Sequence, residues 1–235
     1  MDHEWDGERH DQMHDQADDQ ADEQVDDREE DRVAHYTAIA DELDFETLTV
    51  LVVAGARAEE VRSVVLAEAA PAEGEDLEDD EVSAYAFVEV DGGVLAMEYT
   101  GFADPTVAAL TRLSADGRSV AVVRDNISAH LRFGCARDGA LLFDDDEFAF
   151  IEADDRTRVP DELRPLFDLA WVDLDADDPD EHDDRNPIGV ALAMAEAVTG
   201  VDLTEEDFER AMSLPRSEWH AVRTLAYGGP AESQG

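Results

Sequence analysis

The chain of 235 residues is long enough for one domain of ordinary size with a buried core. Its 62 Asp and Glu face only 17 basic residues, all of them Arg, so the formal net charge is -45 at pH 7 and nucleic-acid phosphates and anionic membrane surfaces are excluded as partners. No apolar stretch approaches the roughly 18 residues that span a bilayer, Cys135 is the only cysteine, and the N-terminus has no secretory signal, so we expect a soluble cytoplasmic protein. The composition, acidic and without Lys, is halophilic-like.

Residues 1–32 carry a large share of the charge. They hold ten Asp, five Glu and three Arg, a net charge of -12, and very few sizeable apolar groups. Such a segment cannot bury enough apolar surface to fold, so we expect a disordered acidic tail. After it, the sequence predicts a sheet core over residues 33–150 and a helical part over residues 151–235 that packs on the same domain.

Short β-branched runs and turn signals define the predicted strands of the core. In chain order these strands cover residues 47–53, 84–90, 94–99, 119–124, 129–136 and 140–143. The turns that join them are Asp91 to Gly93, Asp125-Asn126 and Asp138-Gly139, which are typical of hairpins.

Two helices are predicted between these strands. The first lies within residues 56–70 and stops at Pro71, and the acidic stretch after it is a loop. The second has Asp104 as its cap and Pro105 as its first residue, and it ends near Asp116-Gly117. The resulting β-α-β-β-α-β-β-β order predicts an α+β fold, with an antiparallel or mixed sheet and helices on one face. Its first six elements match the split β-α-β order of ferredoxin-like folds, which by itself carries no activity.

The C-terminal part is predicted to be helical. Residues 161–171 form a short helix limited by Pro165, and residues 187–199 form a longer one between the cap Asn186 and the stop Gly200. A further helix starts after Thr204, and the sequence predicts a last one over residues 217–226.

The stretch from about Asp44 to Phe208 resembles an actinobacterial family of unknown function, domain of unknown function 6461. The likeness lies in the runs TLTVLVVAGARAEEVRSVV, FVEVDGGVLAMEYTGF, LTRLSADGRSVAVVRDNISAHLRFGCARDGALLFD and ALAMAEAVTGVDLTEEDF. None of these runs is a catalytic signature, so the resemblance implies no activity and assigns no residue a role.

Cys135 and His130 are the one thiol and imidazole pair close in sequence that nucleophilic catalysis would need in contact. Residues five apart on a strand face opposite sides. We therefore expect Cys135 to be a buried structural thiol beside Leu131 and Phe133, and His130 to be a surface histidine.

An acidic loop between two predicted helices partly matches a calcium-binding loop. The candidate ligands are Asp173, Asp175, Asp177, Glu181 and Asp184, at its first, third, fifth, ninth and twelfth places. Asp178 stands at the sixth place, where Gly makes the turn, and the twelfth place lacks the bidentate Glu. We expect a solvated acidic loop, with a calcium site as the alternative.

Asp144, Asp145, Asp146 and Glu147 follow the last strand of the core and suggest a Mg²⁺ cluster or a carboxylate pair for acid-base catalysis. No adjoining histidine, no Gly-rich phosphate loop and no nearby arginine that would clamp a substrate accompanies them. We therefore expect a charged cap on a sheet edge. His3, His10 and His14 lie in the acidic tail, where only weak adventitious metal binding is expected.

The leading functional hypothesis is a non-enzymatic, cytoplasmic protein-binding domain without a cofactor, whose acidic surface suits a basic protein such as a toxin or a nucleic-acid-binding protein. The first alternative is a metal-dependent hydrolase that uses the carboxylates of residues 144–147. The second alternative is that the acidity reflects only solubility in a salt-rich cytosol.

Overall fold

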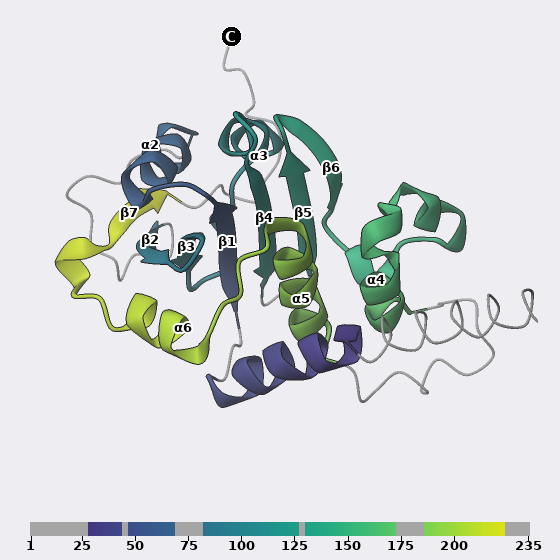
Figure 1. Ribbon diagram of the computed structural model, residues 1–235. Coiled ribbons are helices and arrows are strands. Elements are labelled where there is room, and N and C mark those ends of the chain that lie inside the picture. Colours follow the sequence, from purple (N-terminus) through teal and green to yellow (C-terminus); the bar gives the residue numbers. More distant parts are fainter. Residues whose placement is uncertain (1–27, 44–46, 69–81, 127–129, 173–185, 224–235) are drawn as a thin grey trace, which may run out of the picture.

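The computed structural model describes residues 28–43, 47–68, 82–126, 130–172 and 186–223. Within these residues, seven strands form one sheet in the order β6-β5-β4-β1-β3-β2-β7, and every pair of neighbours is antiparallel (Figure 1). The strands are β1 (Leu48–Ala54), β2 (Val82–Val90), β3 (Gly93–Glu98), β4 (Ser119–Asp125), β5 (Arg132–Arg137), β6 (Ala140–Asp145) and β7 (His220–Arg223).

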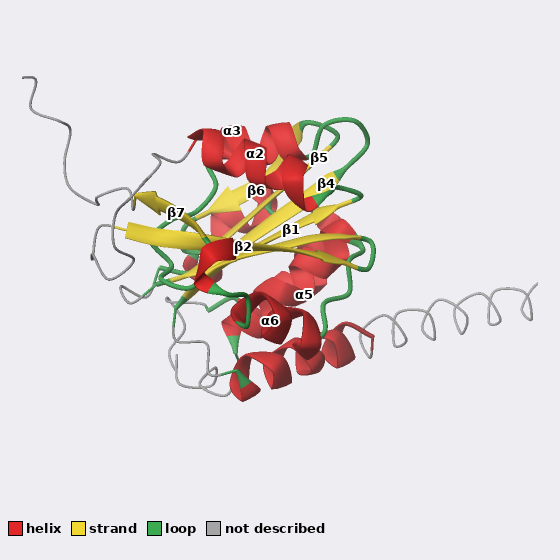
Figure 2. Ribbon diagram, turned by 90° about the vertical axis from the view of Figure 1, so that its left-hand side faces the viewer, coloured by secondary structure: helices red, strands yellow, loops and turns green. Residues whose placement is uncertain are grey.

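Helices cover both faces of the sheet, as Figure 2 shows edge-on. The helices α2 (Ala58–Glu68) and α3 (Val107–Leu113) lie on one face. The other face is covered by a helix over residues 28–42, α5 (Pro187–Thr199) and α6 (Glu205–Met212). The helix α4 (Arg164–Ala170) packs against α5 on the β6 side of the sheet, as Figure 1 shows. Short 3₁₀ turns complete the C-terminal part: η1 (Phe148–Phe150), η2 (Ala153–Arg158), η3 (Asp161–Leu163) and η5 (Arg216–Glu218). The predicted α+β class is confirmed, with the two crossover helices on one face and the C-terminal helices packed on the other.

The centre of the sheet is a split β-α-β arrangement. The strand order β4-β1-β3-β2 places β3 between β1 and β2, which run parallel to each other because both are antiparallel to β3. The helix α2 connects β1 to β2 and the helix α3 connects β3 to β4, and both helices lie on the same side of the sheet. This topology agrees with the predicted element order. The strands β5 and β6 extend one edge as a hairpin, and β7 extends the other.

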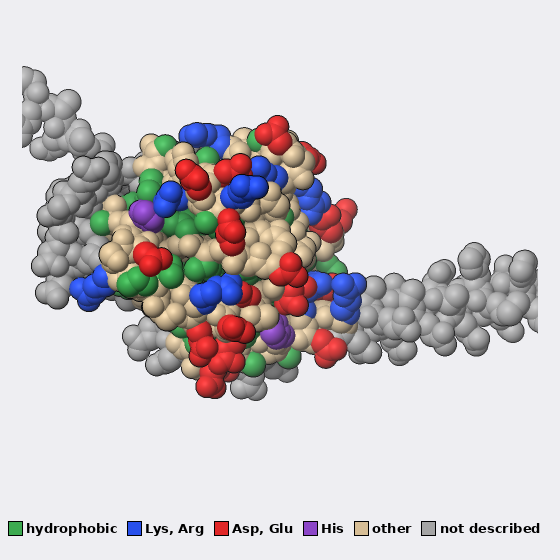
Figure 3. Space-filling view, turned by 60° about the vertical axis from the view of Figure 1, so that its left-hand side comes forward, with side chains coloured by type: hydrophobic (Ala, Val, Ile, Leu, Met, Phe, Trp, Pro, Cys, Tyr) green, Lys and Arg blue, Asp and Glu red, His purple; other side chains and the backbone are tan. Residues whose placement is uncertain are grey.

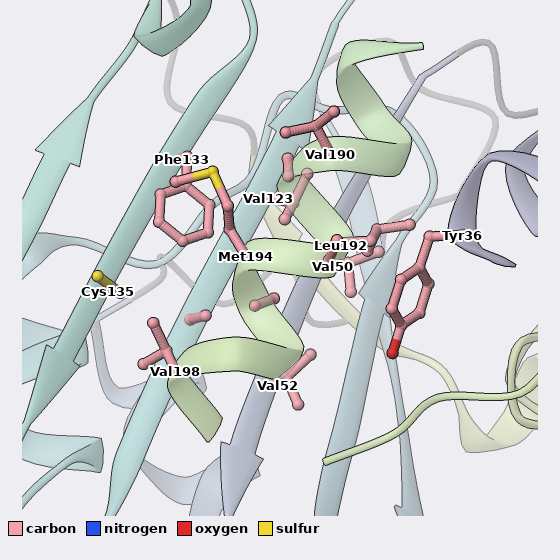
Figure 4. Close-up of a cluster of buried hydrophobic side chains, with 14 of the residues drawn as sticks. Tyr36, Val50, Val52, Val123, Phe133, Cys135, Val190, Leu192, Met194 and Val198 are labelled. Atoms are coloured by element: carbon pink, nitrogen blue, oxygen red, sulfur yellow. The ribbon is translucent and has the colours of Figure 1, made fainter. Parts of the chain in front are cut away.

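The main core lies between the sheet and α5 (Figure 4). Val190, Leu192, Met194 and Val198 of α5 lie over Val50, Val52, Val123 and Phe133 of the central strands. The helix over residues 28–42 closes the same layer through the buried Tyr36 and crosses α5 at Gly189, where an added Cβ would collide with Thr37. Because α5 is covered by the sheet on one side and by helices on others, nearly its whole surface is apolar.

Local signals explain why these elements begin and end where they do. Asn186 caps α5 by accepting from the amides of Ile188 and Gly189, at 3.1 and 3.2 Å, and Gly200 ends it with a φ of 70°. Thr204 caps α6 in a reciprocal capping box with Asp207. All three predicted signals are confirmed.

Two predictions at the ends of the chain are wrong in part. Residues 28–32, which we assigned to a disordered tail, belong to the first helix, where Arg32 binds Glu29 at 2.9 Å and Glu196 of α5 at 3.0 Å. Residues 1–27 lie outside the described residues. Residues 220–223 form β7 and not a helix, because pairing with the free edge of β2 outweighs local helix propensity.

Candidate functional site

Five polar side chains form a row across one face of the sheet, on neighbouring strands. The register aligns Tyr85 with Glu98, Glu98 with Thr49, Thr49 with Arg124 and Arg124 with Arg132. All five residues are buried, at 0–6% exposure. They face α2 and α3 because their neighbours in sequence point into the core beneath α5. We call these five residues the polar row.

The loop over residues 99–106 covers the polar row, and Glu98 holds its first half. The Glu98 carboxylate accepts the amides of Thr100 and Gly101 at 2.7 and 2.9 Å, together with the hydroxyls of Ser83 and Thr100. Burial raises the pKa of Glu98 because desolvation penalises the carboxylate, although these hydrogen bonds act in the opposite direction. Gly101 has a φ of 67° and lies so close to Asp125 that a side chain would collide with its carbonyl oxygen.

Tyr85 holds the middle of the same loop. Its hydroxyl donates to the carbonyl oxygen of Ala103. Its pKa is raised by burial and, to a smaller extent, by the negative charges of Glu98 and Asp104. The phenol therefore remains a hydrogen-bond donor.

Asp104 holds the last part of the loop through two arginines. Its Oδ2 accepts from Nη1 of Arg124 at 3.3 Å and from Nη1 of Arg132, which also donates to the Pro105 carbonyl oxygen at 2.7 Å. Burial alone lowers the pKa of the Arg132 guanidinium, but the attraction of Asp104 and of Asp144 outweighs burial and the pKa is raised. Arg132 therefore stays charged inside the protein.

These contacts correct the predicted role of Asp104 as a helix cap. The cap of α3 is Thr106, whose Oγ1 accepts the amide of Ala109 at 3.1 Å. Pro105 accordingly precedes the helix instead of starting it. The carboxylate of Asp104 is thus available for the two arginines.

The carboxylates of residues 144–147 complete this network at the end of β6. Asp144 pairs with Arg132 at 2.8 Å, Asp146 with Arg124 at 3.1 Å, Asp145 with Arg158 at 3.4 Å, and Glu147 with His130 at 3.0 Å. The prediction that no arginine and no histidine accompanies these residues is wrong, because the folded chain brings Arg124, Arg132 and His130 to them. In the described part of the chain, no group of three or more His, Cys, Asp or Glu side chains is placed to hold a metal ion.

Thr49, at the centre of the polar row, has a different environment. Its Oγ1 is buried and has no hydrogen-bond partner among the described residues, although it lies between Glu98 and Arg124 in the register. The row therefore consists of two hydrogen-bonded clusters, one around Glu98 and one around the two arginines, with the unsatisfied Thr49 hydroxyl between them. Since Glu98 has no exposed surface, it has no access to a substrate, and the arrangement serves to hold the 99–106 loop on the sheet.

Cys135 lies in the core beneath α5, as Figure 4 shows, together with Phe133. It is fully buried, and burial raises the pKa of its thiol to about 12. His130 is 43% exposed and binds Glu147. The prediction of a buried structural thiol and a surface histidine is confirmed.

The predicted calcium ligands Asp173, Asp175, Asp177, Glu181 and Asp184 lie outside the described residues, as do His3, His10 and His14. None of the described helices is long and apolar enough to cross a membrane.

An open groove lies near the end of β3, on the side of the molecule formed by α6 and β7. Its lining residues are Tyr99, Met212, Leu214, Arg216 and Trp219, and its volume is about 360 Å³. Tyr99 and Met212 are 42% and 39% exposed, which is unusual for large apolar side chains in this molecule. We call these five residues the aromatic groove.

Sequence reasoning missed both the arginine pair and the aromatic groove. A signal for the pair was present, because Arg124 and Arg132 interrupt otherwise apolar strand runs, and an arginine in a buried strand needs a carboxylate partner. The groove gave no such signal, since Tyr99 and Trp219 are 120 residues apart and meet only in the folded chain.

A family model described as a family of unknown function, DUF6461, matches residues 32–213, which is more than half of the chain. No curated protein and no solved structure matches the chain.

Proposed function

Since the chain belongs to DUF6461, a family whose description gives no activity, we propose from its own residues that it is a non-enzymatic domain that binds a basic protein. The observation that carries this proposal is the uncompensated negative charge. A basic toxin or a nucleic-acid-binding protein has the complementary charge, whereas nucleic acids and anionic lipids are repelled.

The charge is unevenly divided along the chain. The described residues contain 32 Asp and Glu against 15 Arg, a net charge of -17. The remaining residues contain 30 Asp and Glu against two Arg, a net charge of -28. More than half of the excess negative charge therefore belongs to less than a third of the chain. Acidic residues that served solubility alone would be spread more evenly, so this distribution favours a partner.

Most arginines of the described ranges already pair with carboxylates of the domain itself. At least nine arginines of the described ranges pair with Asp or Glu. Figure 3 shows the outcome on one face, where carboxylates and arginines alternate and hydrophobic side chains are exposed between them. A cationic partner would meet a net negative field that is screened over about 8 Å at physiological salt.

The polar groups with catalytic potential support the non-enzymatic part of the proposal. Glu98, Arg124 and Arg132 are buried and bound to the protein itself. Asp144 and Asp146 are bound to the same arginines, so a substrate would have to displace existing ion pairs to reach them.

The experiment is an affinity purification from the cytosol of the source organism at low and at high salt, with identification by mass spectrometry. We expect one or a few basic proteins at low salt, and their loss at high salt. Each protein found is then produced alone, and its dissociation constant is measured against the full chain and a variant in which the Asp and Glu of residues 1–27 are replaced by Asn and Gln.

A partner of the proposed kind binds with 1:1 stoichiometry and more weakly to the neutralised variant. If no basic protein is recovered at low salt, or if all basic proteins bind equally and without saturation, the proposal is wrong. The second outcome would identify the acidity as a general solubility property.

A further inference from the structure

We infer that the aromatic groove is a binding site for a small apolar carboxylic acid, with Tyr99 and Trp219 holding the apolar body and Arg216 holding the carboxylate. This inference concerns a small ligand and goes beyond the proposed binding of a basic protein.

The shape of the aromatic groove suits a ring or a short alkyl chain. Its volume of about 360 Å³ falls in the range of small-molecule sites, which are mostly apolar with a few polar groups. Tyr99 and Trp219 meet edge to face, with their ring centroids 5.4 Å apart, and Met212 and Leu214 complete the apolar wall.

Hydrogen bonds hold the Trp219 indole and the main chain at Tyr99 before any ligand arrives. Nε1 of Trp219 donates to the Leu214 carbonyl oxygen at 3.0 Å, and the Tyr99 carbonyl oxygen accepts from Oγ1 of Thr47 at 2.9 Å. The indole nitrogen is therefore satisfied, and the faces of the rings remain for apolar contact. A prearranged wall costs less conformational entropy on binding.

Arg216 supplies the charge that selects a carboxylate. It is exposed, and it forms no ion pair with any described residue, in a domain where most arginines are paired. A guanidinium beside an apolar wall binds a carboxylate through two parallel hydrogen bonds, and an apolar body that displaces water strengthens this attraction. Inorganic anions lack that body and are repelled by the negative charge of the whole protein.

The experiment uses the full chain and a pair of matched probes. Hydrocinnamate and its neutral amide carry the same phenylalkyl body and differ only in the carboxylate. Each is titrated while the indole ¹⁵N–¹H resonances of the tryptophans are recorded, with the Trp219 resonance assigned from a Trp219→Phe variant. We expect hydrocinnamate to shift the Trp219 resonance saturably, with an affinity about tenfold above that of the amide.

Two arginine variants distinguish the effect of the Arg216 charge at the groove from the effect of a positive charge elsewhere on the protein. Arg216→Gln should reduce the affinity for hydrocinnamate about tenfold and leave the affinity for the amide unchanged. Arg57→Gln is the matched control, because the Arg57 side chain is also exposed and forms no ion pair with a described residue but lies beyond the opposite end of β1, and it should change neither affinity. The remaining resonances of both variants show whether the fold is preserved.

Equal affinities for the acid and the amide, or an unchanged affinity in Arg216→Gln, would overturn the inference. A third probe, the tripeptide glycyl-glycyl-phenylalanine, tests the source of the carboxylate. If it binds about tenfold more tightly than hydrocinnamate, the occupant is a polypeptide end and the assignment to a small acid is wrong. None of these results bears on the proposed binding of a basic protein, which depends on acidic charge elsewhere.

Discussion

At the level of the polar row, the two faces of the central strands are held together by different forces, whereas farther along the same strands the face toward α2 and α3 is apolar as well. Toward α5, Val50, Val123 and Phe133 make an apolar layer. One residue away on the same strands, Thr49, Arg124 and Arg132 face the 99–106 loop with polar and charged groups. The apolar layer depends on volume and close packing, whereas the polar row depends on its hydrogen bonds and ion pairs.

This difference predicts how each face responds to substitution. In the apolar layer, the cost of a change should follow the volume removed. In the polar row, it should follow the number of charges or hydrogen bonds left without a partner.

The largest effect is expected from Phe133→Ala in the apolar layer. Phe133 is fully buried and contacts the rings of Phe143 and Phe148, at centroid distances of 6.3 and 5.9 Å. Its truncation should lower the free energy of unfolding by about 3–5 kcal/mol in urea denaturation. Phe150 is 43% exposed, and Phe150→Ala should cost less than about 1 kcal/mol. Similar costs for the two variants would mean that the cavity at Phe133 closes by relaxation.

The next largest effect is expected from Arg132→Met in the polar row. Met has a similar length, so the main loss is the charge that binds Asp104 and Asp144, and the free energy of unfolding should fall by about 3 kcal/mol. The control is Arg137→Met on the same strand, where the ion pair with Glu162 at 3.0 Å is partly exposed and should contribute less than about 1 kcal/mol. If both variants cost the same, the arginine pair does not hold the 99–106 loop.

A smaller effect, visible only as a dependence on pH, is expected at Glu98. Its pKa is raised from 4.5 in the folded protein, so the folded state binds a proton more tightly than the unfolded state. Glu98 should therefore lower the stability of the wild type as the pH rises from about 4.5 through the raised pKa, and Glu98→Gln should remove this contribution.

The measurement for Glu98 is the difference in unfolding free energy between the variant and the wild type at pH 4 and at pH 7. The Glu98→Gln variant should become more stable relative to the wild type as the pH rises. Ser217→Ala, at an exposed position without a titratable group, is the control and should show a constant difference. If instead the wild type becomes more stable relative to the variant as the pH rises, the hydrogen bonds to the Glu98 carboxylate outweigh its desolvation.

The apolar face was largely predictable from sequence, and the polar row was not. The run at residues 47–53 identifies a central strand because it is short, β-branched and apolar on both faces. Asp138-Gly139 identifies the hairpin of β5 and β6 because an Asp-Gly pair readily adopts positive φ, which is 53° and 76° in the structure. These signals are local. The pairing of Arg132 with Asp104 spans 28 residues and depends on the register of strands that no local pattern specifies.

The same limit explains the error at β7. Residues 220–223 lack a strong strand pattern, and they become a strand because β2 offers an unpaired edge over Val82–Tyr85. The aromatic groove depends on this pairing as well, since Trp219 directly precedes β7. Fold class and helix ends follow from local chemistry, whereas the site follows from tertiary contacts.

The smallest effect, and the one that best separates the two faces, is expected at Thr49. Its buried Oγ1 has no partner among the described residues, so Thr49→Val replaces an unsatisfied hydroxyl by a methyl group of nearly the same volume. The free energy of unfolding should rise by about 1 kcal/mol, because the cost of desolvating the hydroxyl is removed. Thr106→Val is the matched control with the opposite sign: it removes the cap on Ala109 and should cost about 1 kcal/mol. Urea denaturation at neutral pH resolves both changes, and a loss of stability in Thr49→Val would mean that a buried water satisfies Oγ1, so that the polar row is one continuous network and not two clusters.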